Sequence, residues 1–93
     1  MDEPRCDVVA KVGLVSVRKH GWTLELNLVS WNGHKPKLDL REWSPDGEKM
    51  GKGITLSRQE AEELIDLLEI GLETEEDLHL SPVWEEADQN GKV

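Results

Sequence analysis

The feature that most constrains the fold is a period-two pattern over residues 22–31, in which apolar and polar residues alternate from Trp22 to Leu28. The apolar positions are Trp22, Leu24, Leu26 and Leu28, and those that alternate with them are Thr23, Glu25, Asn27, Val29 and Trp31. Successive side chains of a strand point to opposite faces. The spacing therefore predicts a half-buried β-strand whose leucines face the core.

Three further segments complete a predicted antiparallel meander. Residues 8–17 are rich in β-branched side chains and end at the polar stretch 18–21, as a strand entering a turn does. Residues 37–43 alternate again, with Lys37, Arg41 and Trp43 opposite the leucines. Asn32-Gly33 and the Pro-Asp-Gly sequence at 45–47 are typical of reversals. Residues 52–56 are then expected to form a short fourth strand.

A helix should follow the fourth strand. Ser57 and Glu60 have the spacing of a capping box, so the helix is expected to begin at Arg58. Its predicted core stripe consists of Ala61, Leu64, Ile65, Leu68 and Leu72. The additional apolar residues Leu67 and Ile70 favour a second protomer as partner. The expected fold is thus α+β, a four-stranded meander followed by one helix, in a homodimer. The expected dimer interface comprises Leu64, Leu67, Leu68 and Ile70.

Charge divides the chain into two parts. Residues 1–57 hold nine basic and eight acidic residues, whereas residues 58–93 hold two and twelve. We predict a flexible N-terminus at 1–7, one domain at 8–73 and an acidic tail at 74–93. The tail either competes with a polyanion for the basic surface or serves only solubility. The tail also contains an apolar segment, Leu78, Leu80, Val83 and Trp84, which is either disordered or docks on this domain or a partner.

Several classes of function are disfavoured. The 93-residue chain has room for one small core and little for a deep substrate chamber. No apolar run approaches a membrane span, and the N-terminus does not resemble a secretory signal, so we expect a cytoplasmic protein, nucleoid-associated if bacterial. The single Cys6 is interpreted as a bystander, and no histidine spacing indicates a metal site. We therefore expect no enzyme, no catalytic residue, no metal and no cofactor.

A basic and aromatic surface remains as the candidate site. On the predicted face opposite the leucines, or in the loops beside it, lie Trp31, Lys35, Lys37, Arg41, Trp43, Lys49 and Lys52. Single-stranded nucleic acid is held by cations that follow the phosphates and by aromatic planes that stack on bases. The alternative interpretation is that the charges only solvate a sheet while both tryptophans pack under the helix or at a dimer contact. The residue pattern alone leaves both interpretations open.

A family resemblance bears on this choice. The matching segments are residues 21–22, 29–32, 36–41, 43–46 and 48–57. The most specific part runs from Asp39 to Ser57, where an Asp-x-Arg strand, a Pro-Asp turn, Lys-Met-Gly-Lys-Gly and a helix cap occur in order. This pattern resembles YdbC-type bacterial relatives of the transcriptional positive cofactor four.

The resemblance implies a homodimer of β-meander and helix that binds single-stranded DNA. By position, Lys37, Arg41 and Trp43 match the family's third-strand groove residues, and Lys49 and Lys52 match its basic loop. Trp31 matches its aromatic position. The expected function is a sequence-tolerant single-stranded-DNA-binding accessory factor of transcription, replication or repair. The alternatives are RNA binding and a protein-interaction module that recruits a transcription or repair partner.

Overall fold

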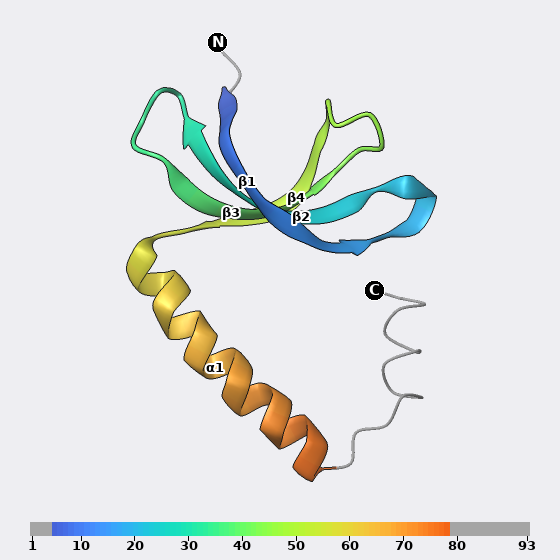
Figure 1. Cartoon of the computed structure of the whole chain (residues 1–93), viewed down its shortest axis with the longest axis vertical. Helices are drawn as coiled ribbons and strands as arrows, with labels where there is room; N and C mark the ends of the chain where they lie inside the picture. Colours follow the sequence, from blue (N-terminus) through green and yellow to red (C-terminus); the bar gives the residue numbers. More distant parts are fainter. Residues whose placement is uncertain (1–4, 79–93) are drawn as a thin grey trace. The chain divides into compact units, whose positions relative to one another are not determined.

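The computed structural model describes residues 5–78 and contains four strands followed by one helix (Figure 1). The elements are β1 (Cys6–Val17), β2 (Thr23–Trp31), β3 (Lys37–Trp43), β4 (Met50–Leu56) and α1 (Arg58–Asp77), with a 3₁₀ turn at Lys19–Gly21. The strands pair antiparallel in the order β1-β2-β3-β4, which confirms the predicted meander and the α+β class. Among the helices of the described residues, none has the length and hydropathy that a membrane span requires.

The two faces of the sheet follow from the pairing of β2 with β3, which contains no bulge. Residues that oppose each other share a face, as Glu25 does with Arg41 and Asn27 with Asp39. The inner face, as we name it, consists of Thr23, Glu25, Asn27, Val29 and Trp31 of β2 with Lys37, Asp39, Arg41 and Trp43 of β3. The outer face carries Leu24, Leu26, Leu28, Leu38 and Leu40. This is the division that the alternation predicts.

Strand β1 is longer than its partner and bulges three times. Its twelve residues run opposite the nine of β2. The residue left without a partner at each register shift is a valine: Val9, Val12 and Val15. Bulges bend a strand and increase its twist. The strands bend toward the same side, so the inner face becomes concave (Figure 1).

The most buried residues of the sheet lie on the inner face, and not among the leucines of the outer face. Val29 and Asp39 are fully buried, and Asn27 and Trp43 are 2% and 8% exposed. The outer-face leucines are only half-buried, and Ile54 of β4 is more than half exposed. The bend explains the difference, because side chains converge on the concave face of a sheet and spread apart on the convex face.

The turn between β2 and β3 also fixes the start of β1. Asn32 and Gly33 have φ of 53° and 79°, and the His34 N–H donates to the Trp31 carbonyl at 2.9 Å. Positive φ at both central residues is the type I′ geometry that Asn-Gly favours. The Asn32 side chain accepts from the Arg5 N–H at 2.8 Å. β1 therefore begins inside the segment 1–7 that we expected to be flexible.

Helix α1 begins where predicted and ends later. The Ser57 N–H donates to the Glu60 carboxylate at 2.9 Å, and the Glu60 N–H donates to the Ser57 hydroxyl at 3.1 Å, which is a capping box. The helix continues to Asp77, so residues 74–77 are helical and not part of an irregular tail. Glutamate is a good helix former, which favours this extension. Residues 79–93 of the predicted tail lie outside the described residues.

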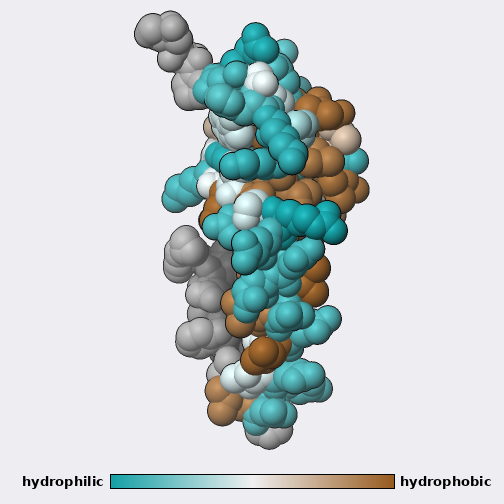
Figure 2. All heavy atoms as spheres, turned by 90° about the vertical axis from the view of Figure 1, so that its left-hand side faces the viewer, coloured by the Kyte–Doolittle hydropathy of each residue, from teal (hydrophilic) through white to brown (hydrophobic). Residues whose placement is uncertain are grey.

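Apolar side chains of α1 remain exposed in the single chain. None of its residues is buried, and Leu64 is half-buried. The apolar side chains that are more than half exposed are Ile65, Leu67, Leu68, Ile70 and Leu72. Figure 2 shows such apolar atoms in brown among the polar atoms of the surface.

Candidate nucleic-acid interface

A buried ion pair lies at the centre of the inner face. The Arg41 Nε and Nη2 donate to the two carboxylate oxygens of Asp39 at 2.9 and 3.0 Å. Asp39 is fully buried, and the Arg41 side chain is 14% exposed. The residues are two apart on β3, so they share a face and meet side by side. A bidentate pair of this kind holds the guanidinium plane in one orientation.

Thr55 of β4 connects this ion pair to Trp31. Its hydroxyl donates to the Asp39 carboxylate at 2.8 Å and accepts from the Trp31 indole N–H at 3.1 Å. The register brings Thr55 opposite Asp39, which explains the first contact. The Arg41 guanidinium carbon also lies 5.4 Å from the centre of the Trp31 ring, within cation–π range. The half-buried Trp31 ring is therefore held at its N–H and over its face.

Arg41 keeps donors that the protein does not use. Its Nη1 donates to the Gly51 carbonyl at 3.0 Å, in addition to the two bonds to Asp39. A guanidinium has five N–H groups. Two of them therefore have no hydrogen-bond partner among residues 5–78. A slightly exposed cation with two free donors can contact one phosphate or one base edge.

Trp43 does not form the exposed stacking plane that we expected. Its side chain is on the inner face with Trp31 and Arg41, but it is buried. Its indole N–H is also buried and has no acceptor within the described part of the chain. The ring lies at the end of β3, where a bulge separates the Arg41 pair from the Trp43 pair with β4. Of the two predicted tryptophans, only Trp31 is thus partly exposed.

The four lysines of the predicted site are all exposed. Lys37 lies at the start of β3 on the inner face, and Lys35 precedes it in the connection from β2. Lys49 and Lys52 follow the other end of β3, with Lys52 in the irregular stretch of β4. Within residues 5–78 none of the four forms an ion pair with a carboxylate. The structure therefore brings Trp31 and Arg41 together and sets the lysines near the two ends of β3.

A hydrogen-bonded turn holds the loop that carries Lys49. The Ser44 N–H donates to the Lys49 carbonyl, and the Lys49 N–H donates to the Ser44 hydroxyl oxygen, both at 2.9 Å. The Ser44 hydroxyl in turn donates to the Asp46 carboxylate. This bond and the Glu48 N–H hold the pKa of Asp46 below its ordinary value of 3.8. The basic loop is thus ordered by its own acidic residue.

Cys6 lies at the edge of the same face, opposite Trp31 in the pairing of β1 with β2. Burial raises the pKa of its thiol above 9.0, and the nearby Asp39 carboxylate raises it further. A thiol in this environment stays neutral and unreactive at neutral pH. Its interpretation as a bystander is consistent with this chemistry, although Cys6 lies in β1 and not in a flexible terminus.

Sequence reasoning missed Asp39 and Thr55 as members of the site. The Asp-x-Arg spacing was a usable signal for Asp39, because residues two apart on a strand are neighbours on one face. Thr55 has no such signal, since its partners depend on the register of β4 against β3. Neither residue contacts solvent strongly, so their contribution is to orient Trp31 and Arg41.

Two comparisons with known proteins bear on the family of this chain. A family model for the transcriptional coactivator p15 (PC4) matches residues 18–67, which is more than half of the chain and spans β2, β3, β4 and the first half of α1. An uncharacterized protein of Treponema pallidum (strain Nichols) is 49% identical over 67 residues, covering 72% of this chain and 79% of that protein. The chain therefore belongs to the transcriptional coactivator p15 (PC4) family, whose members bind single-stranded DNA and act as transcription cofactors.

Proposed function

We propose that the protein binds single-stranded DNA with little sequence preference along the inner face, and that it catalyses no reaction. Trp31 supplies a plane for one base, and Arg41 and the four lysines contact phosphates. Stacking on an aromatic side chain contributes ~1–3 kcal/mol per base and tolerates every base, since each has a π-face. The bound strand then gains most of its remaining affinity from phosphate contacts.

The observation that carries this proposal is the network from Trp31 through Thr55 and Asp39 to Arg41. Burying a carboxylate is costly, and replacing such a pair with apolar residues often stabilises a protein. A sheet that only needed a core would gain nothing from this arrangement. A nucleotide, in contrast, needs an exposed ring on which its base can stack and a cation beside it for its phosphate, and Trp31 and Arg41 are suited to these two contacts.

The lysines give the proposal a salt dependence. Lys35 and Lys37 precede the Trp31 and Arg41 cluster along β3, and Lys49 and Lys52 follow it. Cations on both sides of a stacking plane can follow a backbone that passes over it. Each phosphate contact lowers the logarithm of the affinity by roughly 0.7 per tenfold increase in salt on a single strand. Duplex DNA should bind more weakly because its bases are already stacked.

We also propose that two copies associate through α1. The dimer surface comprises Leu64, Leu67, Leu68 and Ile70, three of which are more than half exposed in one chain. An apolar surface of this kind on a small protein favours a partner. A symmetric dimer would carry two inner faces and so engage two segments of DNA.

A protein-interaction role remains the second candidate, and the exposed valines of β1 favour it. Val9, Val12 and Val15 lie at the bulges of an edge strand, and each is more than half exposed. An edge strand can pair with an extended segment of a transcription or repair protein. Of the predicted docking segment from Leu78 to Trp84, residues 79–84 lie outside the described residues.

Fluorescence anisotropy tests the proposal. Labelled oligo-dT, its oligo-U equivalent and a duplex of equal length are titrated at two salt concentrations. We expect oligo-dT to bind more tightly than the duplex, and Lys37→Gln to flatten the salt slope by roughly 0.7. The matched control is Lys19→Gln in the 3₁₀ turn between β1 and β2, which should keep the slope. Equal affinity for single strand and duplex would refute the proposed mode.

A further inference from the structure

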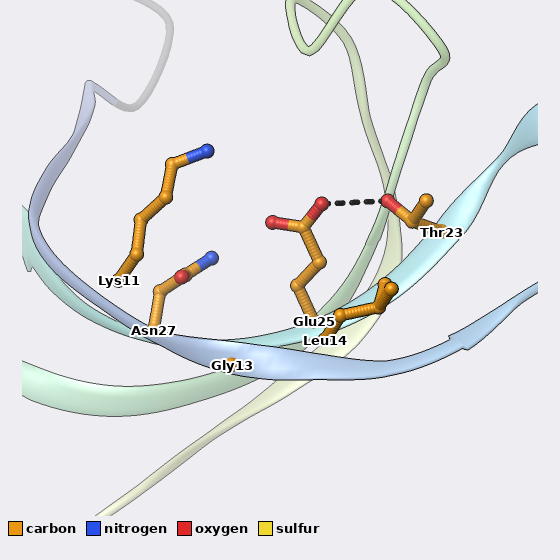
Figure 3. Close-up of a pocket in the computed structure, with 6 residues that line it drawn as sticks. All are labelled: Lys11, Gly13, Leu14, Thr23, Glu25 and Asn27. Carbon is orange, nitrogen blue, oxygen red and sulfur yellow. Dashed lines mark hydrogen bonds between the residues drawn. The ribbon is translucent and has the colours of Figure 1, made fainter.

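A hollow on the inner face lies next to the Trp31 and Arg41 cluster and has a volume of about 290 Å³. Its lining residues are Lys11, Gly13, Leu14, Thr23, Glu25 and Asn27. Figure 3 shows the side chains of Lys11, Thr23, Glu25 and Asn27 rising from β1 and β2 on the inside of the bend. This volume is at the lower end of the range for small-molecule sites and suits one flat ring system.

Asn27 is the unusual member of this lining. It is 2% exposed, and its side-chain amide has no hydrogen bond with any other residue in the range 5–78. Buried polar groups nearly always have partners. The Asn27 amide keeps only the small solvent contact that the hollow allows, since the Trp43 indole nitrogen is the one fully buried, unpartnered side-chain polar atom among the described residues. The amide projects into the hollow (Figure 3). Its unused donors and acceptor therefore point to a ligand at this position.

Two charged groups flank the amide. The Thr23 hydroxyl donates to one carboxylate oxygen of Glu25 at 2.7 Å, which orients that side chain. The other oxygen has no hydrogen-bond partner within the described chain, and neither Glu25 nor the exposed Lys11 has an ion-pair partner there. The hollow thus contains the Glu25 carboxylate as an acceptor, the Asn27 amide as both donor and acceptor, and the Lys11 ammonium as a donor. Leu14 adds an apolar side chain beside them.

We propose that this hollow holds one base of the bound DNA strand and prefers guanine there, while the rest of the strand is bound with little sequence preference. This inference rests on the single-stranded-DNA binding proposed above. The Watson–Crick edge of guanine offers two adjacent donor groups, N1–H and N2–H₂, next to the acceptor O6. The Glu25 carboxylate accepts from the donor groups, while the Asn27 amide or the Lys11 ammonium donates to O6. The edges of unstacked bases are read in this way in single strands.

The other bases match this set of groups less well. Thymine has one N–H between two carbonyl oxygens, and a carboxylate placed at that N–H faces both oxygens. Adenine and cytosine offer one amino group beside an unprotonated ring nitrogen, so the carboxylate gains only one donor group. A good bidentate contact discriminates by about fivefold or more between bases.

The position of the hollow is consistent with a strand that passes over Trp31. Glu25 lies opposite Arg41 and Asn27 opposite Asp39 in the pairing of β2 with β3. Opposed residues on one face are within side-chain contact distance. A base in the hollow would therefore lie beside the cation that contacts its phosphate, and the next base could stack on Trp31.

The test compares four oligonucleotides that differ only at the central position of an oligo-dT strand. That position carries thymine, adenine, guanine or hypoxanthine, the last of which is guanine without its N2 amino group. We expect guanine to bind about fivefold or more tightly than thymine, and hypoxanthine to lose most of this gain. Glu25→Gln should remove the preference. The matched control is Glu42→Gln on the outer face, which should retain it.

The outcomes separate this inference from the function on which it rests. Tight binding of all four strands with equal affinity would overturn the guanine site and leave single-strand binding intact. Failure to bind any of the four would overturn both. Because the hypoxanthine comparison uses the unaltered protein, it decides the question even if Glu25→Gln fails to fold.

Discussion

Thr55→Val tests whether the network on the inner face has the structure and the role described above. Valine keeps the shape and the β-branching of threonine but has no hydroxyl. The substitution removes the bond that Thr55 donates to Asp39 and the bond that it accepts from the Trp31 indole. It leaves the bidentate contact between Asp39 and Arg41 in place.

The two lost bonds set the size of the effect. The bond to the Asp39 carboxylate involves a charged and fully buried group, so its loss costs about 1.5–3 kcal/mol. The bond from the half-buried Trp31 indole is neutral and contributes about 0.5–1.5 kcal/mol. We therefore expect the free energy of unfolding to fall by about 2–4 kcal/mol. Affinity for oligo-dT should fall by about fivefold or more, because a loosened ring loses part of its stacking energy.

Urea unfolding at fixed protein concentration measures the stability, and anisotropy measures the affinity. With a slope of about 1 kcal/mol per molar urea for so small a domain, the midpoint should fall by about 2 M or more. Thr55→Ser is the matched control, since it keeps the hydroxyl and should retain the affinity. A Thr55→Val protein whose stability lies within about 0.5 kcal/mol of the wild type would refute the reasoning.

Two further predictions concern acid and the C-terminal segment. The folded-state pKa of Asp46 lies below 3.8, so its interaction with Ser44 stabilises the fold above that pH and is lost as the pH falls below it. The melting temperature of Ser44→Ala should therefore decrease less between pH 5 and pH 3 than that of the wild type, and parallel curves would contradict this. Truncation after Glu73, which removes the predicted acidic tail, should raise affinity for oligo-dT at low salt and have little effect at high salt, because screening weakens competition by the tail. Unchanged affinity at low salt would leave solubility as the tail's role.

Local patterns in the sequence predict the elements of this fold well. The alternation over 22–31 gives β2 and the division of its residues between two faces. The spacing of Ser57 and Glu60 gives the first residue of α1. Each of these signals depends on residues within a few positions of one another, where backbone geometry alone decides which groups meet.

The burial of the inner face could not be predicted in the same way. It depends on the three bulges of β1, which are visible only in the register against β2. The buried Trp43 and the Thr55 contact likewise depend on the pairing of β3 with β4. The alternation indicates which side chains share a face, but not which face of the sheet is concave. The pattern alone therefore predicts a core on the leucine face and two exposed tryptophans, whereas the sheet buries its inner face and Trp43.

The central claim is that Trp31, and not Trp43, contacts unpaired bases. Indole N–H resonances measure this most directly in a ¹H–¹⁵N spectrum recorded during titration with oligo-dT, with assignments from single Trp→Phe variants. We predict that the Trp31 indole resonance shifts progressively with added DNA, while the resonance of the buried Trp43 changes little. A Trp31 resonance that stays in place while the DNA is bound would contradict the account.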